Sequence, residues 1–165
     1  MTSPSISSRS LSFIGFIACA LLIAIALYFQ YIEGLDPCPL CIFQRVAFTS
    51  MGVVFLASFL HNPTNVGRKL YGFLASVCGV LGLGIAARHV WLQSLPADQV
   101  PECGPGLDYM LEVFPFSKVL ETVFKGAGEC AEVSWTWFGI SMPGWSLIWL
   151  AVLTTLALML ILRKS

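Results

Sequence analysis

Apolar residues are concentrated in four long stretches of the chain, at about 11–29, 42–60, 70–87 and 145–162. Each stretch is long enough to cross a hydrocarbon core of about 30 Å as a helix, at about 1.5 Å per residue. A soluble helical domain of 165 residues needs more polar surface than this chain offers. The pattern therefore predicts an all-α membrane protein, a bundle of four transmembrane helices.

The segments between these stretches differ sharply in charge. The N-terminal tail, the 61–69 loop and the C-terminus carry basic residues and no acidic ones: Arg9, Arg68, Lys69, Arg163 and Lys164. All nine acidic residues fall in the two other connections, at about 30–41 and 92–144. By the positive-inside rule, both termini are predicted to be cytoplasmic and the two acidic loops to face the outer compartment. The low share of charged residues, 11%, and the lack of a basic stripe exclude a nucleic-acid partner.

The long outer loop has a pattern of its own. Between about 107 and 124, apolar and charged residues interleave as in short amphipathic helices that lie on a membrane surface, and Pro115 is expected to interrupt them. The tryptophans within 135–145 are typical of an interfacial aromatic belt. Small residues in the third span either form a packing seam or reflect the general composition of membrane helices: Gly72, Ala75, Ser76, Gly79 and Gly82. We expect a single membrane domain over residues 1–165.

The six cysteines fall into two groups. Four lie in the outer loops or directly beside them: Cys38, Cys41, Cys103 and Cys130. This number of cysteines is plausible in an oxidising compartment. Cys19 and Cys78 lie near the middle of the first and third spans, where a cysteine most often acts as a small apolar residue. We therefore assign chemistry to the four outer cysteines only.

Cys38 and Cys41 form a two-residue-spaced pair directly before the second span. This spacing permits a small disulfide ring that opens and closes easily, and the N-terminus of a helix favours a thiolate. Arg45 follows Cys41 by four residues, on the same helical face and one turn deeper. An arginine just inside a span is costly without a partner, so we expect it to support an anion or to bind an oxygen of a headgroup. The alternative is an arginine that only extends to the interface.

Cys103 and Cys130 lie in glycine-containing segments of the long loop. Cys103 is followed by Gly104-Pro105-Gly106, and Cys130 follows Gly126 and Gly128. Such segments are exposed and movable, so a disulfide between the two cysteines would be accessible to a protein partner. A static staple of the loop and a four-thiolate zinc site are the alternatives. The wide separation of this pair and the outer compartment favour disulfides, so no metal is predicted.

Disulfide chemistry at a membrane requires a final electron acceptor, because thiol–disulfide exchange only moves electrons between sulfurs. A strongly oxidising thiol protein at about −120 mV needs an acceptor of higher potential, which glutathione at about −200 mV is not. A quinone is the lipid-soluble oxidant available inside a membrane. The chain has no haem-ligand pair and no nucleotide-binding fingerprint. The sequence therefore favours a quinone, ubiquinone or menaquinone, as the cofactor.

The chain resembles the disulfide bond formation protein B (DsbB) family, the quinone-linked inner-membrane oxidases of bacteria. The likeness runs from the first span to the fourth. It rests on these motifs: Cys38-Pro39-Leu40-Cys41 with Arg45, Arg88-His89, Cys103-Gly104-Pro105-Gly106, Gly128-Glu129-Cys130, and Trp137-Phe138-Gly139 to Met142-Pro143 with Trp145 beyond. The resemblance implies a multi-pass protein of the bacterial inner membrane whose active loops face the periplasm.

The resemblance also implies roles for the cysteines. Cys103 and Cys130 would form the disulfide that reoxidises a periplasmic thioredoxin-fold thiol oxidase (DsbA-like), with Cys103 in the mixed disulfide. The reduced pair would pass its electrons on when Cys130 attacks Cys38. Cys41 would then interact with a quinone of the membrane pool, helped by Arg45.

His89 would lie near the quinone headgroup according to the resemblance, whereas its residue type alone fits an interfacial histidine without a ligand equally well. Three alternatives to an oxidase remain: a vitamin K epoxide reductase-like protein, a disulfide-reducing membrane protein, and a non-enzymatic adaptor whose outer loop is stapled by disulfides. In a vitamin K epoxide reductase-like protein, the cysteine pair is expected near the end of a later span, whereas Cys38 and Cys41 precede the second span of this chain. The adaptor predicts unreactive Cys38 and Cys41 and no bound quinone.

Overall fold

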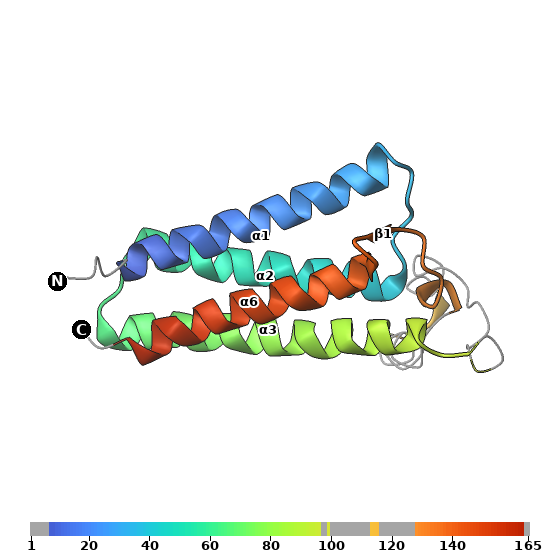
Figure 1. The fold of residues 1–165 in the computed structure, drawn as a ribbon. Helices are drawn as coiled ribbons and strands as arrows, with labels where there is room; N and C mark the ends of the chain where they lie inside the picture. Colours follow the sequence, from blue (N-terminus) through green and yellow to red (C-terminus); the bar gives the residue numbers. More distant parts are fainter. Residues whose placement is uncertain (1–6, 97–98, 100–112, 116–127, 164–165) are drawn as a thin grey trace.

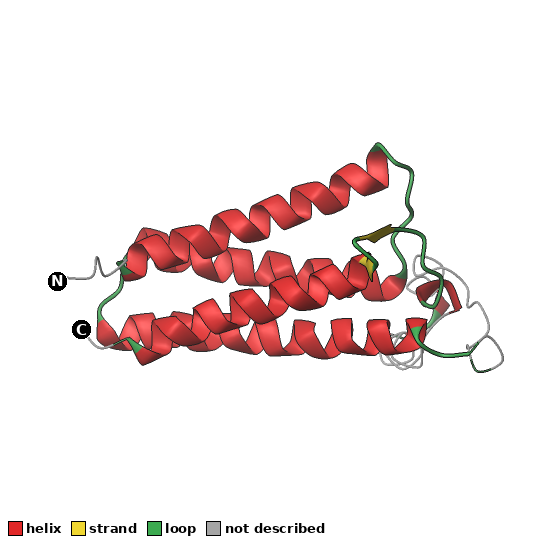
Figure 2. Cartoon of the chain, in the orientation of Figure 1, coloured by secondary structure: helices red, strands yellow, loops and turns green. Residues whose placement is uncertain are grey.

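The computed structural model describes residues 7–96, 99, 113–115 and 128–163. Within them, four long helices account for most of the chain: α1 (Ser8–Tyr31), α2 (Pro39–His61), α3 (Asn65–Gln93) and α6 (Met142–Leu162). Each of the four is long and apolar enough to cross a membrane. The predicted all-α bundle of four spans is therefore confirmed (Figure 2).

The helices extend beyond the apolar stretches that predicted them. The clearest case is α3, which begins at Asn65 and ends at Gln93 although its apolar stretch covers only about 70–87. A helix satisfies its own backbone hydrogen bonds, so it continues into polar sequence, whereas hydropathy marks only the part suited to hydrocarbon. The connections are correspondingly short: residues 32–38 join α1 to α2, and residues 62–64 join α2 to α3.

The four helices run alongside one another, and both termini lie at the same end of the bundle (Figure 1). We call this the terminal end. The neighbours that pack extensively are α1 with α2, α2 with α3, and α3 with α6, whereas α1 and α6 touch little. The α1–α2 connection lies at the opposite end, which we call the outer end, together with the described part of the chain between α3 and α6. The cytoplasmic location of the termini stays a prediction from charge.

Small residues of α3 form a close interface with α6. Gly72, Gly79 and Gly82 are buried. A Cβ atom added at Gly79 would overlap the Thr154 hydroxyl of α6, and one added at Gly82 would press on Leu150. The two backbones can approach only because these side chains are missing. The small residues are therefore a packing seam rather than a mere reflection of composition.

The middle of the bundle is filled by apolar side chains. Met51 and Phe55 of α2 are fully buried, and the Phe55 ring packs directly against Gly15 of α1. Cys19 of α1 is buried against Gly52 of α2, so it acts as the small apolar residue that was expected.

A short hairpin leads the chain into α6 at the outer end. Strands β1 (Thr136–Trp137) and β2 (Ile140–Ser141) pair antiparallel, and Phe138 and Gly139 between them have φ values of 51° and 75°. Positive φ at both positions is the geometry of a tight two-residue turn. The 3₁₀ helix η1 (Gly128–Cys130) precedes the hairpin. The interfacial helices predicted within 107–124 lie outside the described residues, which include only 113–115 of that segment.

Candidate active site

The N-terminus of α2 brings two cysteines together. Cys38 is the N-cap, with Pro39 at the first helical position, and Cys38 Sγ accepts a hydrogen bond from the backbone N–H of Cys41 at 3.4 Å. The Cys38 and Cys41 sulfurs lie 3.0 Å apart as free thiols. This cap geometry gives the pair the short separation that an exchangeable disulfide requires.

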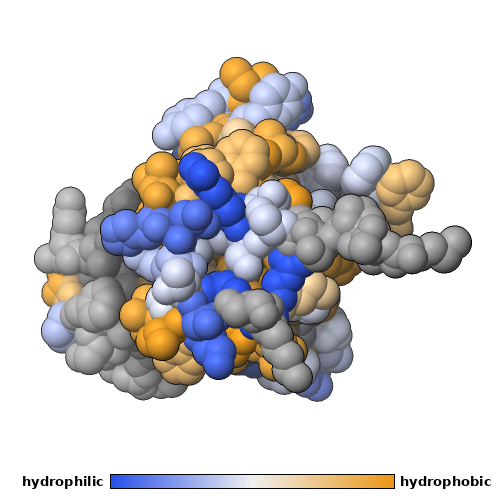
Figure 3. All heavy atoms as spheres, turned by 90° about the vertical axis from the view of Figure 1, so that its left-hand side faces the viewer, coloured by the Kyte–Doolittle hydropathy of each residue, from blue (hydrophilic) through white to orange (hydrophobic). Residues whose placement is uncertain are grey.

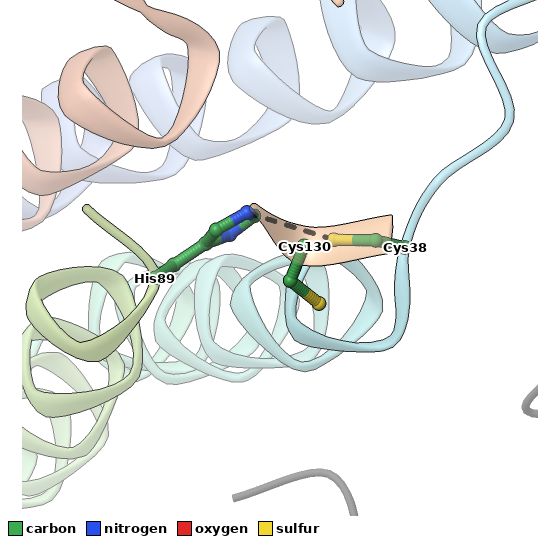
Figure 4. Close-up of side chains that lie close together, drawn as sticks. All are labelled: Cys38, His89 and Cys130. Atoms are coloured by element: carbon green, nitrogen blue, oxygen red, sulfur yellow. Dashed lines mark hydrogen bonds between the residues drawn. The ribbon is translucent and has the colours of Figure 1, made fainter. Parts of the chain in front are cut away.

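Cys130 reaches the same place from the long loop. Its side chain is 1% exposed and packs with Leu40 and Leu92 beside Cys38. The sulfurs of Cys38 and Cys130 and a ring nitrogen of His89 all lie within 4.8 Å of one another (Figure 4). The expectation of an exposed Cys130 is wrong, because η1 packs against α3 and the apolar neighbours cover the thiol.

The predicted partner of Cys130 in the second pair, Cys103, lies outside the described residues. Cys130 is a free thiol whose neighbour is Cys38. The structure thus brings together three of the four predicted redox cysteines. The Cys103–Cys130 disulfide stays a prediction.

His89 lies between Cys38 and Gln44 in the interior of the bundle. Its side chain is 2% exposed, with Nε2 3.7 Å from Cys38 Sγ and Nδ1 3.1 Å from the Gln44 side-chain amide. These two contacts hold the imidazole ring between α2 and the N-cap of the same helix. His89 is therefore a buried residue with defined partners, and its closeness to a quinone headgroup stays a prediction.

Arg45 lies one turn below Cys41 on α2 and turns toward α1. Its Nη1 donates to the side-chain oxygen of Gln30, and its Nη2 donates to the backbone carbonyl of Ala26 at 3.0 Å. Both acceptors are neutral, so the guanidinium keeps its positive charge uncompensated by these bonds. Arg45 therefore has defined partners on α1, and its role in supporting an anion or binding a headgroup oxygen stays a prediction.

A cavity of about 320 Å³ lies at the outer end. Its volume falls in the range of about 300–1,000 Å³ that is typical of small-molecule sites. Its lining includes a group of polar or sulfur-bearing side chains: Cys38, Cys41, Gln44, Arg45, His89 and Gln93. Apolar and aromatic side chains make up much of the rest: Leu22, Ile23, Ile25, Phe29, Trp135, Trp137, Trp145 and Trp149. The cavity therefore connects Cys38 and Cys41 to a space that suits an apolar molecule with a polar head.

The pKa of Cys130 is raised well above its ordinary value by its hydrogen bond with Cys38 and by burial of the thiol. The thiolate is the nucleophile in disulfide exchange. Cys130 is therefore protonated at neutral pH in this arrangement, and its attack on a disulfide requires a group that accepts the proton.

Cys38, His89 and Cys130 also offer the ligand types of a zinc site. We assign them to thiol exchange instead, because Cys41 lies within 3.0 Å of Cys38 and forms the two-residue-spaced pair with it. The absence of a resident metal stays a prediction.

Sequence reasoning missed Gln44 and the role of the tryptophans. Gln44 directly precedes Arg45, and two adjacent polar residues inside an apolar span were a usable signal. The sequence predicts interfacial anchors for the tryptophans, whereas in the structure Trp137 and Trp145 pack with ring centres 5.3 Å apart and line the cavity. Their residue type alone gave no sign of this, because an anchor and a cavity wall use the same side chain.

Comparisons with known proteins identify the chain's relatives. The family model for disulfide bond formation protein DsbB matches residues 8–160. Disulfide bond formation protein B of Nitrosococcus oceani is 57% identical over 143 residues, which cover 87% of this chain and 85% of the relative. The protein of the same name from Marinobacter nauticus is 49% identical over 158 residues, covering 96% and 94% of the two chains.

The match extends over nearly the whole chain, from the start of α1 to two residues before the end of α6, and includes the described part of the site. It decides among the alternatives that the sequence left open, since neither a reductase nor a stapled adaptor carries this family's function. The chain belongs to the disulfide bond formation protein B (DsbB) family, inner-membrane dithiol:quinone oxidoreductases that reoxidise DsbA and pass its electrons to quinones.

Proposed function

We propose that the cavity at the outer end is where this chain hands electrons to a quinone, and that Cys38, Cys41, Cys103 and Cys130 carry them there. The observation that carries the proposal is a cluster of three sulfurs, two of which line a cavity with many apolar side chains in its walls. Cys38 and Cys41 both line this cavity, and Cys130 lies within 4.8 Å of Cys38. A relay from a protein thiol to a lipid-soluble acceptor needs this connection.

The lining fits the chemistry of a quinone. Its carbonyl oxygens accept hydrogen bonds, and Arg45 is a charged donor that remains available beside the cavity. The apolar side chains of α1 suit an isoprenoid tail, which is hydrocarbon. When bound, a quinone takes up two electrons and two protons and becomes a quinol. Ubiquinone and menaquinone share the two carbonyl groups, so both are candidates.

The central sulfur step is an exchange between two elements that the fold places together. The Cys130 thiolate attacks Cys38 of the Cys38–Cys41 disulfide, so that the Cys38–Cys130 bond forms and Cys41 leaves with the electron pair. Cys41 lines the cavity, one turn from Arg45. The positive charge of Arg45 favours the Cys41 thiolate there.

We propose that His89 accepts the proton that the Cys130 thiol loses in this step. Cys130 must lose its proton before it attacks, and a His89 ring nitrogen lies within 4.8 Å of its sulfur. Gln44 supports either form of the ring, because its amide can donate to or accept from Nδ1. His89 also lines the cavity, which supports its predicted place near the headgroup.

The dithiol partner is proposed to be a periplasmic thioredoxin-fold thiol oxidase of the DsbA type. Its dithiol would be oxidised by the Cys103–Cys130 disulfide, with Cys103 forming the mixed disulfide. The two electrons then reside on Cys103 and Cys130, from which Cys130 begins the exchange with Cys38. The burial of Cys130 supports the assignment of the mixed disulfide to Cys103, because a partner protein cannot reach the Cys130 thiol directly.

The test is quinone reduction by the purified protein with a reduced partner of this type. Soluble ubiquinone and menaquinone analogues are supplied in parallel, and their absorbance is followed. We expect turnover by the wild type, none by Cys41→Ser, and normal turnover by the matched control Cys19→Ala, whose cysteine lies away from the cavity. Turnover that survives in Cys41→Ser, with both quinones, would remove Cys41 from the route.

A further inference from the structure

A buried arginine at the terminal end has no counter-ion in the described part of the chain. Arg68 of α3 is 7% exposed. Its Nη2 donates to the Asn65 side chain at 3.4 Å and to the backbone carbonyl of Arg163. Its Nε–H is buried and has no partner among the described residues. A buried charged group with an unused donor is costly, and an acceptor would relieve that cost.

A second unused donor comes from the helix that packs against α3. Nη1 of Arg163, directly after the last turn of α6, is also buried without a partner among the described residues. The Arg68 guanidinium contacts the backbone carbonyl of Arg163, so the two residues that carry these unused donors are neighbours. None of the chain's acidic residues falls within 1–32, 37–97 or 133–165, so the four helices contain no carboxylate side chain to neutralise them.

The start of α3 adds to the positive character of this place. Its N-cap, Thr64, makes no side-chain capping bond, and the first turn contains no acidic residue. The free N–H groups of a helix N-terminus favour an anion. Arg68 lies within hydrogen-bonding distance of Asn65, the first residue of the helix. Seen from the terminal end, hydrophilic side chains gather among apolar ones (Figure 3).

We propose that Arg68 and Arg163 form a binding site for a phosphate group, of the kind that an anionic phospholipid headgroup presents at a membrane surface. Guanidinium groups match the oxygens of a phosphate with paired N–H donors. Basic pockets between transmembrane helices are known to hold lipid headgroups. Arg163 is only partly buried and follows the end of its helix, so its side chain can turn to admit the phosphate.

The competing explanation is that Arg68 only caps α6. The bond from Nη2 to the Arg163 carbonyl satisfies a carbonyl group at the end of that helix, and this alone gives Arg68 a structural role. A cap does not use Arg68 Nε or Arg163 Nη1, which are the two donors left over. The two explanations therefore differ in whether Arg163's side chain matters.

The experiment measures phospholipid retained by the purified full-length protein, by native mass spectrometry, after exchange into neutral detergent with phosphatidylglycerol or phosphatidylcholine. All forms carry the same C-terminal purification tag. Arg163→Gln and Arg68→Gln are compared with Lys69→Gln, which removes the same charge from the neighbouring residue. Thermal unfolding is also measured with added inorganic phosphate at constant ionic strength. A stabilising effect of phosphate would distinguish a site for the free ion from a site for a lipid headgroup.

We expect the wild type and Lys69→Gln to retain phosphatidylglycerol over phosphatidylcholine, and Arg163→Gln to bind it about tenfold more weakly or worse, as expected for one lost bond to an ionised group. Stabilisation by inorganic phosphate alone would identify the ion as the ligand of the same site. Equal retention of phosphatidylglycerol by Arg163→Gln and the wild type, with no response to phosphate, overturns the proposal. This holds even if Arg68→Gln fails to fold.

Discussion

The two halves of the bundle use the same helices in opposite ways. In the middle and at the terminal end, α2 and α3 bury side chains tightly, as where Gly79 meets Thr154 and Phe55 meets Gly15. At the outer end, the same two helices supply Cys41, Arg45 and His89 to a cavity of about 320 Å³. One pair of helices therefore carries both the packing that holds the fold and the groups to which we assign the chemistry.

The comparison shows what each half requires of its residues. The packed half requires small size, because a single Cβ at Gly79 has no space. The outer half requires reactive groups at defined separations, such as the 3.0 Å between the Cys38 and Cys41 sulfurs. Even the cysteines follow this division, since Cys19 packs as an apolar side chain and Cys38 caps a helix. Substitutions in the two halves should therefore fail in different ways.

The largest expected effect belongs to Cys130→Ser, which tests the route within the outer half. Without this nucleophile, quinone reduction driven by the protein partner should fall by roughly 10³-fold or more. A small dithiol such as dithiothreitol can reduce the Cys38–Cys41 disulfide directly, so turnover driven by it should persist. Both activities are measured by quinone absorbance in the same preparation. If the variant keeps its partner-driven rate, Cys130 does not stand between the partner and Cys38.

Arg45→Gln should give the next largest effect, on quinone binding. Losing a charged donor to a quinone oxygen should raise the KM for quinone by about tenfold to a hundredfold. Arg45→Lys keeps the charge but loses the paired N–H donors of the guanidinium. Its KM for quinone should therefore lie between those of the wild type and Arg45→Gln. Gln30→Ala, which removes an acceptor that holds Arg45, should move KM in the same direction by less. An unchanged KM in Arg45→Gln would place the quinone away from this side chain.

A matched pair of glycine substitutions in α3 should give the smallest effect and should change stability rather than chemistry. Gly79→Ala pushes a methyl group into Thr154 and should cost about 1–3 kcal/mol of stability. Gly84→Ala meets nothing within 4 Å and should be neutral or slightly stabilising. Thermal unfolding in detergent, followed by circular dichroism, measures both. Equal melting temperatures for the two variants would contradict the packed seam.

The sequence predicted those features that depend on neighbours along the chain. The four spans follow from hydropathy, and the closeness of Cys38, Cys41 and Arg45 follows from helical spacing. The burial of Cys130 did not follow, because it depends on how a distant loop segment packs on Leu40 and Leu92. For the same reason, no local pattern indicated that Cys130 would lie beside Cys38.

The cavity could not be predicted from the sequence, for a related reason. Its walls come from α1, α2, α3, α6 and the hairpin region, so its existence depends on the separation of helices that share no local pattern. Gln44 was recognisable as a polar residue in a span, but its partner His89 is on another helix. The family resemblance implied a quinone site, and the packing of the helices forms the cavity that we propose for it.

The central claim is that Cys130 exchanges with Cys38 at the outer end, and a disulfide trap tests it most directly. In Cys41→Ser, the Cys38 thiol has lost its usual partner and can attack Cys130 of the Cys103–Cys130 disulfide, releasing Cys103 as a thiol. Peptide mapping of this variant under non-reducing conditions should therefore recover a Cys38–Cys130 linkage and a Cys103 that reacts with an alkylating reagent. Recovery of an intact Cys103–Cys130 linkage, together with a freely alkylated Cys38, would contradict the account.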